Sequence, residues 1–343
     1  MDKFKDIRAY RSCGLVYLVD FLTILPAIQF NIWTKTKGLK LDYLQLPDMT
    51  AKQSRKAIER DIRHGAFYMT NHRDIVMDAA YLSVRLIPRY GHHPYIGIGN
   101  NLFGKWWIEP LCRFLRTFVV KRNGSPREIM QSSQLLSEYI QLIRKHGKSI
   151  WMAQREGRAK DGNDRTQPSV LKMLTLSAEN NHDLIDQIKI LNICPVSLSY
   201  EYDPCDFLKA AEMQLKRDNP NWRKSKKDDI LSMKTGINGY KGKVVFRMTP
   251  SINHWIDAHR AELEGMTKND LLHNIAAQID KQIFLGYEIF TRGTEFDNYI
   301  ESRIALINIP NKDEAFLREK LYEMYRYPEI NFRQADTLEK NYK

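Results

Sequence analysis

Thr70-Asn71-His72-Arg73-Asp74-Ile75-Val76-Met77-Asp78 joins a short apolar run to a helix-like pattern. Residues 66–69 before it have the length and composition of a buried strand, and residues 78–87 begin a pattern typical of a helix. The stretch therefore predicts a strand-to-helix turn, where a rigid scaffold presents loop side chains. It places His72 close to two carboxyl groups, Asp74 and Asp78.

A neutral imidazole at such a turn can take a proton from a hydroxyl group. It needs a carboxylate that fixes its tautomer and stabilises the imidazolium that forms. Asp74 and Asp78 are both candidates for that carboxylate. A structural interpretation is also open, in which Asp74 caps the helix and His72 has no chemical role.

Other segments with strand composition alternate with helical ones along the chain. A capping box at residues 50–53 predicts a helix, a second helix is predicted over 128–146, and residues beyond 251 are predicted to be mostly helical. Strands separated by helices indicate an α/β sheet, which binds ligands beyond its strand ends. The predicted strands cover residues 66–69, 95–98, 117–122, 148–153, 191–198 and 243–249.

The composition is that of a globular protein, with 43% hydrophobic and 27% charged residues among 343. A net charge of +12 predicts an acidic partner, such as an anionic membrane, a phosphorylated substrate, an acidic carrier protein or nucleic acid. Nucleic acid is disfavoured because the cations are dispersed and no binding motif accompanies them. The four cysteines lack metal-type spacing, which favours free thiols in a reducing compartment.

The apolar run at residues 13–33 is the candidate for membrane contact. Asp20 and Pro26 interrupt it, and a charge near the middle of a span costs roughly 2.5–3.5 kcal/mol on insertion scales. We therefore favour an interfacial or re-entrant element over a buried core helix or a true span. Trp33 precedes a cationic stretch that is typical of an anchor at a membrane surface, with Lys35, Lys37 and Lys40.

Four segments, taken in order, resemble the four sequence blocks of the glycerolipid acyltransferase family, and its lysophosphatidic-acid (1-acyl-sn-glycerol-3-phosphate) acyltransferases are the nearest match. The segments are residues 71–78, 118–122, 155–158 and 194–198. The longer pattern, including residues 200–204 and 239–242, is similar to a branch found in Bacteroidetes-type bacteria. The resemblance implies an α/β fold with a central mixed sheet flanked by helices. The resemblance covers about residues 66–200. Together with the apolar run and the C-terminal helical pattern, it predicts a membrane-associating segment at 1–50, the acyltransferase domain at 51–250 and a helical C-terminal extension at 251–343.

The first block departs from the family pattern. The family separates its histidine and aspartate by four residues, whereas five separate His72 from Asp78, and Met77 stands where the family has the aspartate. One extra residue turns a helix by about 100°. A longer turn before the helix would absorb it, so we favour Asp78 as the partner of His72 and keep Asp74 as the alternative.

The resemblance also implies roles for individual residues. His72 is expected to be the general base, and Arg122 to hold the phosphate of the acceptor. Arg155 departs from the family's Phe-Pro and is expected to add a cation to the pocket, while residues 194–196 are expected to form pocket wall. The third block is expected to bind the acceptor, with Arg158 on phosphate oxygens, and consists of Glu156, Gly157 and Arg158.

The implied activity moves a fatty acyl group from an acyl thioester to the hydroxyl of a lysophospholipid, turning lysophosphatidic acid into phosphatidic acid. Acyl carrier protein or coenzyme A would carry the donor, and neither a metal nor a further cofactor is implied. We expect a peripheral or monotopic protein on the cytosolic face of the cytoplasmic membrane. Two alternatives stay open: an O-acyltransferase for an amino-acid-based lysolipid, and a non-catalytic lipid- or nucleic-acid-binding protein.

Overall fold

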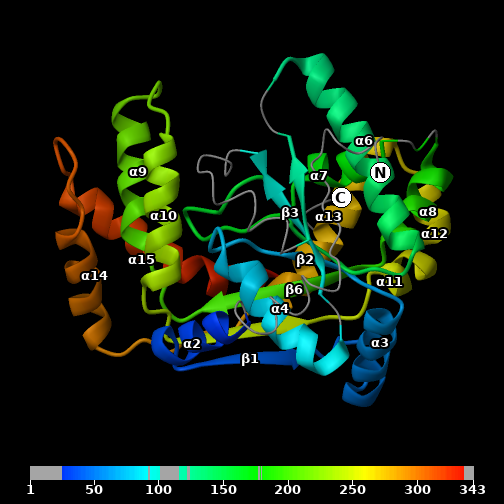
Figure 1. The fold of residues 1–343 in the computed structure, drawn as a ribbon, viewed down its shortest axis with the longest axis horizontal. Coiled ribbons are helices and arrows are strands. Elements are labelled where there is room, and N and C mark those ends of the chain that lie inside the picture. The colour runs from blue at the N-terminus through cyan, green and yellow to red at the C-terminus, as the bar shows by residue number, and fades with distance from the viewer. Residues whose placement is uncertain are drawn as a thin grey trace.

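The computed structural model describes residues 25–91, 93–100, 116–121, 124–176, 178 and 180–335. A seven-stranded sheet runs through the centre of these residues, with helices on both of its faces (Figure 1). The strand order is β1-β7-β6-β2-β5-β3-β4. The strands are β1 Gly38–Tyr43, β2 Phe67–Thr70, β3 Tyr95–Gly99, β4 Thr117–Val120, β5 Ile150–Ala153, β6 Ile193–Tyr200 and β7 Lys243–Met248.

The sheet is mixed. Strands β2 to β6 pair in parallel, β7 runs antiparallel to β6, and β1 runs parallel to β7. The predicted α/β fold with a central mixed sheet and flanking helices is therefore confirmed. Strand β1 was not predicted, since only Leu39 of its six residues is buried and its sequence lacks a continuous apolar run.

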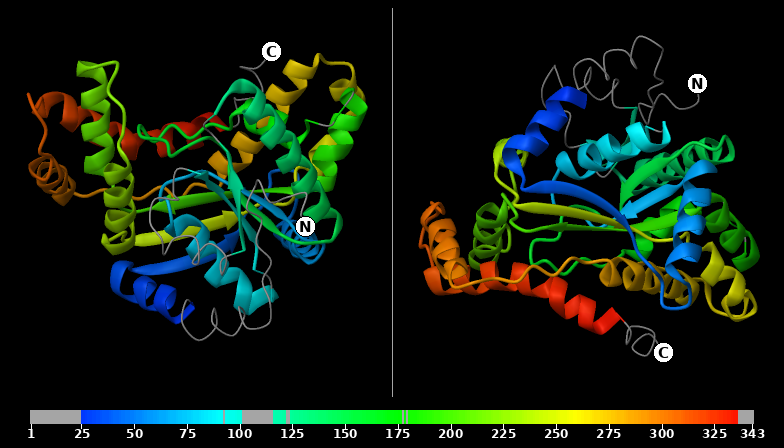
Figure 2. Two further views of the ribbon diagram at one scale, coloured as in Figure 1. Left: turned by 45° about the horizontal axis from the view of Figure 1, so that its top comes forward. Right: turned by 90° about the horizontal axis from the view of Figure 1, so that it is seen from below.

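Side-chain alternation along the strands divides the core between the two faces of the sheet. In β2, Phe67 and Met69 pack into one cluster and Tyr68 packs into the other. The first face is covered by α6 Pro126–Lys145, α7 Pro168–Leu174, α8 Asn181–Leu191, α11 Asn253–Ala258, α12 Arg260–Glu264 and α13 Lys268–Leu285. The second face is covered by α2 Leu25–Lys35, α3 Ala51–Arg63 and α4 Met77–Tyr90, as the two views of Figure 2 show.

A third apolar cluster lies beside the sheet. It joins α9 Asp206–Asp218 to α14 Glu295–Ala305 and α15 Glu314–Gln334. Helix α10 Lys226–Asn238 runs next to α9 and reaches α2 with its C-terminal end (Figure 1). The C-terminal region is thus helical, as predicted, although α11 to α13 belong to the main core and a boundary at residue 250 does not separate them from it.

Local signals account for several helix limits. The predicted capping box of Thr50 and Gln53 opens α3, and Ser125 with Glu128 forms another at α6. Helix α4 continues through Pro88, although proline in a helix interior commonly ends or kinks the helix. It ends at Gly91, whose φ of 65° is the left-handed conformation that glycine adopts readily.

The N-terminal element is described from Leu25 onward, so most of the apolar run at 13–33 lies outside the described residues. In α2 only Ile32 is buried, whereas Phe30 is 63% and Trp33 is 77% exposed. This part of the run is therefore not a buried core helix. None of the described helices is long and apolar enough to cross a membrane. Strand β1 follows within the predicted segment 1–50 and pairs with β7, so that segment is not separate from the sheet.

Candidate active site

The first and third sequence blocks meet at the carboxyl end of the parallel strands. Strand β2 lies between β5 and β6, and its last residue, Thr70, is in register with Ala153 and Val196. The loop after β2 carries His72, and the loop after β5 carries residues 155–158. Neighbouring parallel strands end at the same edge, which brings these two loops together.

His72 and Asp78 form a hydrogen-bonded pair. The distance between His72 Nδ1 and Asp78 Oδ2 is 2.8 Å, and the side chains are 13% and 0% exposed, respectively. The Asp78 carboxylate also accepts hydrogen bonds from the backbone N–H groups of Arg73 and Asp74 and from the Tyr200 hydroxyl. These donors fix the carboxylate beside the imidazole.

The extra residue of the first block lies in the turn and not in the helix. Helix α4 begins at Met77, so Asp78 is in its first turn, while residues 71–76 form the loop that precedes it. That loop folds over the Asp78 carboxylate and donates two backbone N–H groups to it. A wider turn therefore brings Asp78 to His72 without a change in helical phase.

Asp74 has a different set of partners. Its Oδ1 accepts hydrogen bonds from the backbone N–H groups of Val76 and Met77, at 2.9 and 2.8 Å, at the start of α4. Burial and the nearby Asp78 charge raise the pKa of Asp74. Gly236 of α10 lies so close that a Cβ atom there would come within 1.9 Å of Asp74 Oδ2. The geometry thus assigns Asp74 to the helix start.

A buried polar network holds the rest of the His72 loop. The Asn71 side chain exchanges hydrogen bonds with the backbone N–H and carbonyl of Leu198 in β6. The Arg73 guanidinium pairs with Asp164 at 2.8 Å, and Lys209 Nζ donates to the Arg73 carbonyl at 3.2 Å. Lys209 also pairs with Asp203 at 2.5 Å. Sequence reasoning missed these four partners, because they lie far from the loop in sequence.

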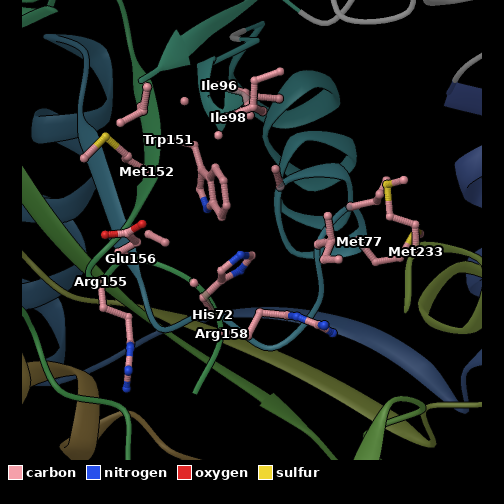
Figure 3. Close-up of a pocket in the computed structure, with 18 of the residues that line it drawn as sticks. His72, Met77, Ile96, Ile98, Trp151, Met152, Arg155, Glu156, Arg158 and Met233 are labelled. Carbon is pink, nitrogen blue, oxygen red and sulfur yellow. The ribbon is translucent and has the colours of Figure 1, made fainter. Parts of the chain in front are cut away.

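His72 lines a cavity of about 1350 Å³. The imidazole lies edge-on to the Trp151 ring, with centroids 6.0 Å apart, and Figure 3 shows both side chains in the cavity. Much of the described wall is apolar and comes from both faces of the sheet. It includes Ile28 of α2, Met77 and Ala80 of α4, Ile96 and Ile98 of β3, Met152 of β5, Met173 of α7, and Met233 and Ile237 of α10.

The polar end of the cavity contains the third block. Gly157 has a φ of 70°, and a Cβ atom there would meet nothing within 4 Å. Burial opposes the charge of Arg158, but Cys205, Asp203 and Asp74 outweigh it, so the pKa of Arg158 is raised. Its Nη1 is buried and has no hydrogen-bond partner within the described structure. Arg158 is thus a charged residue that lines the cavity, while its Nη1 atom is buried behind the cavity surface.

Arg155 lines the same cavity but extends away from His72 in Figure 3. Its Nη1 donates to the Asn163 carbonyl at 3.4 Å, and its charge acts on the buried Asp164 carboxyl. The expectation of an added pocket cation therefore holds for position, while much of this charge faces the buried network. Glu156 also lines the cavity, and its backbone N–H donates to Gln167 Oε1 at 2.8 Å.

Other expectations have mixed outcomes. Arg122 lies outside the described residues, although its neighbour Lys121 lines the cavity. Residues 194–196 are buried within β6 and do not line this cavity, so the expectation of pocket wall is wrong. Helices α9 and α10 supply one wall of the cavity, although the sequence around them is polar.

Comparison with known proteins finds a family match for one segment of the chain. A search of curated proteins finds no match. Residues 49–176, which contain His72, Asp78 and the third block, match the family model described as Acyltransferase. This segment, 128 of the 343 residues, is similar to the acyltransferase family, and the similarity supports acyl transfer in general without indicating an acceptor or a donor.

Proposed function

We propose that the chain transfers a fatty acyl group from an acyl thioester to the hydroxyl of a lysophospholipid, with lysophosphatidic acid as acceptor and phosphatidic acid as product. The observation that carries the proposal is the His72–Asp78 pair at the polar end of a large, mostly apolar cavity. A hydroxyl acceptor needs a base, and acyl chains need an apolar space beside it.

The chemistry follows from the hydrogen bonding of the imidazole. With Nδ1 held by Asp78, His72 has Nε2 left as the proton acceptor. Nε2 takes the hydroxyl proton as the acceptor oxygen attacks the thioester carbonyl carbon. The C–S bond then breaks, and the imidazolium returns the proton to the leaving thiolate. Such acid-base catalysis contributes typically ~10²–10⁴-fold, and Asp78 stabilises the imidazolium between the two transfers.

Arg158 supports an anionic acceptor. It is charged, lines the cavity and has a buried Nη1 without a protein hydrogen bond in the described structure. A guanidinium that lines the cavity suits phosphate oxygens, which accept charge-assisted hydrogen bonds. Lys209 and Lys160 line the same cavity and are ion-paired with Asp203 and Glu212, respectively. The family resemblance adds Arg122 to this set as a proposal.

Helix α2 supports entry of the acceptor from a membrane surface. Phe30 and Trp33 are exposed, and their rings lie 5.9 Å apart on one side of the helix. Leu25, Ile28 and Asn31 of the same helix line the cavity. A helix with apolar groups on its outer side and a cavity on its inner side suits a peripheral position at the lipid headgroups, where exposed Lys37 and Lys40 meet anionic lipid.

The test is acyl transfer to radiolabelled lysophosphatidic acid by membranes that carry wild type, His72→Ala or His146→Ala at equal abundance. Donors carried by acyl carrier protein and by coenzyme A are run in parallel. Wild type is expected to be active, His72→Ala to lose at least ~10²-fold, and His146→Ala, an exposed control at the end of α6, to match wild type.

Two results would contradict the proposal. Full activity of His72→Ala would exclude the histidine mechanism. Product with an amino-acid-based lysolipid, and none with lysophosphatidic acid, would keep acyl transfer and replace the acceptor by one with a carboxylate.

A further inference from the structure

Tyr200, outside the matched segment 49–176, touches the candidate catalytic pair. It is the last residue of β6, next to β2 in the sheet, and only 7% of it is exposed. Its hydroxyl donates to Asp78 Oδ1 at 2.8 Å, while Asp78 Oδ2 faces His72 Nδ1 at the same distance. The two carboxylate oxygens are thus shared between a tyrosine and a histidine.

We propose that Tyr200 is a positioning residue, which sets the orientation of the Asp78 carboxylate and thereby the readiness of His72 to hold a proton. The phenol and the imidazole compete for the negative charge of one carboxylate. The catalytic consequence rests on the function proposed above, but the effect on His72 does not.

The geometry suits a permanent donor. The Tyr200 ring packs edge-on to that of Tyr81, with centroids 6.4 Å apart and planes at 71°, so it has little freedom to turn. Burial, and then the charge of Asp78, raise the pKa of Tyr200 well above its usual value. The hydroxyl therefore keeps its proton at working pH and remains a donor.

Other titratable groups also face this site and must stay constant in any comparison. Asp74 and Arg73 lie on the same loop, and Arg158 lies on the loop after β5. The charges of Asp74 and Asp78 also act on Tyr81 of α4 and on the buried Lys241, which precedes β7. Replacement of Tyr200 by phenylalanine leaves all of them in place and removes one hydroxyl.

Loss of the phenol leaves more of the carboxylate charge for the imidazole. Protonated His72 is then favoured, so His72 stays protonated to a higher pH and is less available as a base. The carboxylate also loses one of the bonds that fix its orientation. Both effects lower the rate near neutral pH, and only the first moves the titration of His72.

The test is an NMR titration of the His72 imidazole in wild type, Tyr200→Phe and Tyr81→Phe, with His72→Ala to identify the signal among nine histidines. Tyr81 is a matched control, since its buried hydroxyl donates to Asn31 at 2.7 Å and not to Asp78. Tyr200→Phe is expected to raise the titration midpoint by about half a pH unit or more, and Tyr81→Phe to leave it within about 0.2 units.

A second measurement covers misfolding of the variant. Site-specific replacement of Tyr200 by 3-fluorotyrosine leaves the rest of the chain unchanged and makes the phenol a stronger hydrogen-bond donor. The titration midpoint of His72 is then expected to fall. An unchanged midpoint in folded Tyr200→Phe, or an equal rise in Tyr81→Phe, would overturn the proposal. If Tyr200→Phe does not fold, an unchanged midpoint with fluorotyrosine would overturn it.

Activity is measured on the same variants. Tyr200→Phe is expected to lose about tenfold in kcat, with the acid limb of its pH profile moved upward and KM within about twofold. A shifted midpoint in a protein without acyl transfer would support the role of Tyr200 and contradict the proposed function. Full acyl transfer by Tyr200→Phe with an unshifted His72 midpoint would support the proposed function and contradict the role of Tyr200.

Discussion

The side of the sheet covered by α4 and the side covered by α13 each bury a carboxyl group, in different surroundings. Asp78 accepts hydrogen bonds from two backbone N–H groups, a tyrosine and His72, and it lies behind a residue that lines the cavity. Asp280 of α13 is 1% exposed, and one oxygen accepts the backbone N–H and hydroxyl of Thr166. Burial raises the pKa of Asp280 to about 7.

Burial of a carboxyl group therefore does not by itself indicate a catalytic site in this protein. The two carboxyl groups differ in their hydrogen-bond donors and in whether a partner side chain reaches the cavity. Asp78 couples to an imidazole that reaches the cavity, whereas Asp280 couples the loop before α7 to a core helix. We therefore propose a catalytic role for Asp78 and a stabilising role for Asp280, and the following predictions test that division.

The largest effect is expected from Asp78→Asn. An amide cannot stabilise the imidazolium and can favour the wrong tautomer of His72, so kcat is predicted to fall about 10³-fold with little change in KM. Steady-state acyl transfer measures this. Asp74→Asn is the control, because Asp74 holds the start of α4, and it is predicted to lose less than tenfold. Equal losses of kcat in Asp78→Asn and Asp74→Asn would contradict the assignment of Asp78 as the partner of His72.

Asp280→Asn is predicted to act on stability and not on kcat. The folded state raises the Asp280 pKa from 3.8 to about 7, so it binds the proton more tightly than the unfolded chain. Stability from this group is full below about pH 4 and is lost as the pH rises to about 7. Denaturant titrations should show wild type losing roughly 2 to 3 kcal/mol more than the variant between pH 5 and pH 8. The same loss in both would contradict this account.

Arg158→Ala is predicted to raise the KM for lysophosphatidic acid about 10- to 100-fold, as expected for loss of a charge-assisted hydrogen bond. Arg155→Ala, whose charge faces Asp164, should raise it less. Both are measured with the acyl donor at saturation. A larger rise in KM for Arg155→Ala than for Arg158→Ala would indicate that the headgroup binds beside Arg155 and the buried network.

The smallest effect is expected on the exposed side of α2. Trp33→Ala removes an exposed aromatic group from α2, so binding to vesicles with anionic lipid is predicted to weaken several-fold in a sedimentation assay. Phe332→Ala, an exposed aromatic change on α15, should leave binding unchanged. If Trp33→Ala and Phe332→Ala bind the vesicles equally well, α2 does not contact the membrane.

Local sequence patterns were sufficient for much of the fold. The apolar runs predicted six of the seven strands, and the capping box at Thr50 predicted the start of α3. Strand β1 was missed because it depends on pairing with β7, which lies about 200 residues later. The local pattern did not give the end of α4, which continues past Pro88 to Tyr90.

The site was predictable only where residues lie near each other in sequence. His72 and Asp78 are six positions apart, and the resemblance supplied the third block. Tyr200 and Lys209 reach the loop across 122 and 136 residues, through sheet order and helix packing that no local pattern encodes. Arg122 stays a prediction, and so do the catalytic roles of the other residues.

A double-mutant cycle on His72→Ala and Asp78→Asn tests the central claim most directly, since residues that act as a unit lose activity together. Initial rates of acyl transfer are measured for wild type, both single variants and the double variant. The account predicts that the double variant is no slower than His72→Ala, because Asp78 acts only through the imidazole. A double variant slower than His72→Ala by the full factor of the Asp78→Asn loss would show that the two residues act independently and would contradict the account.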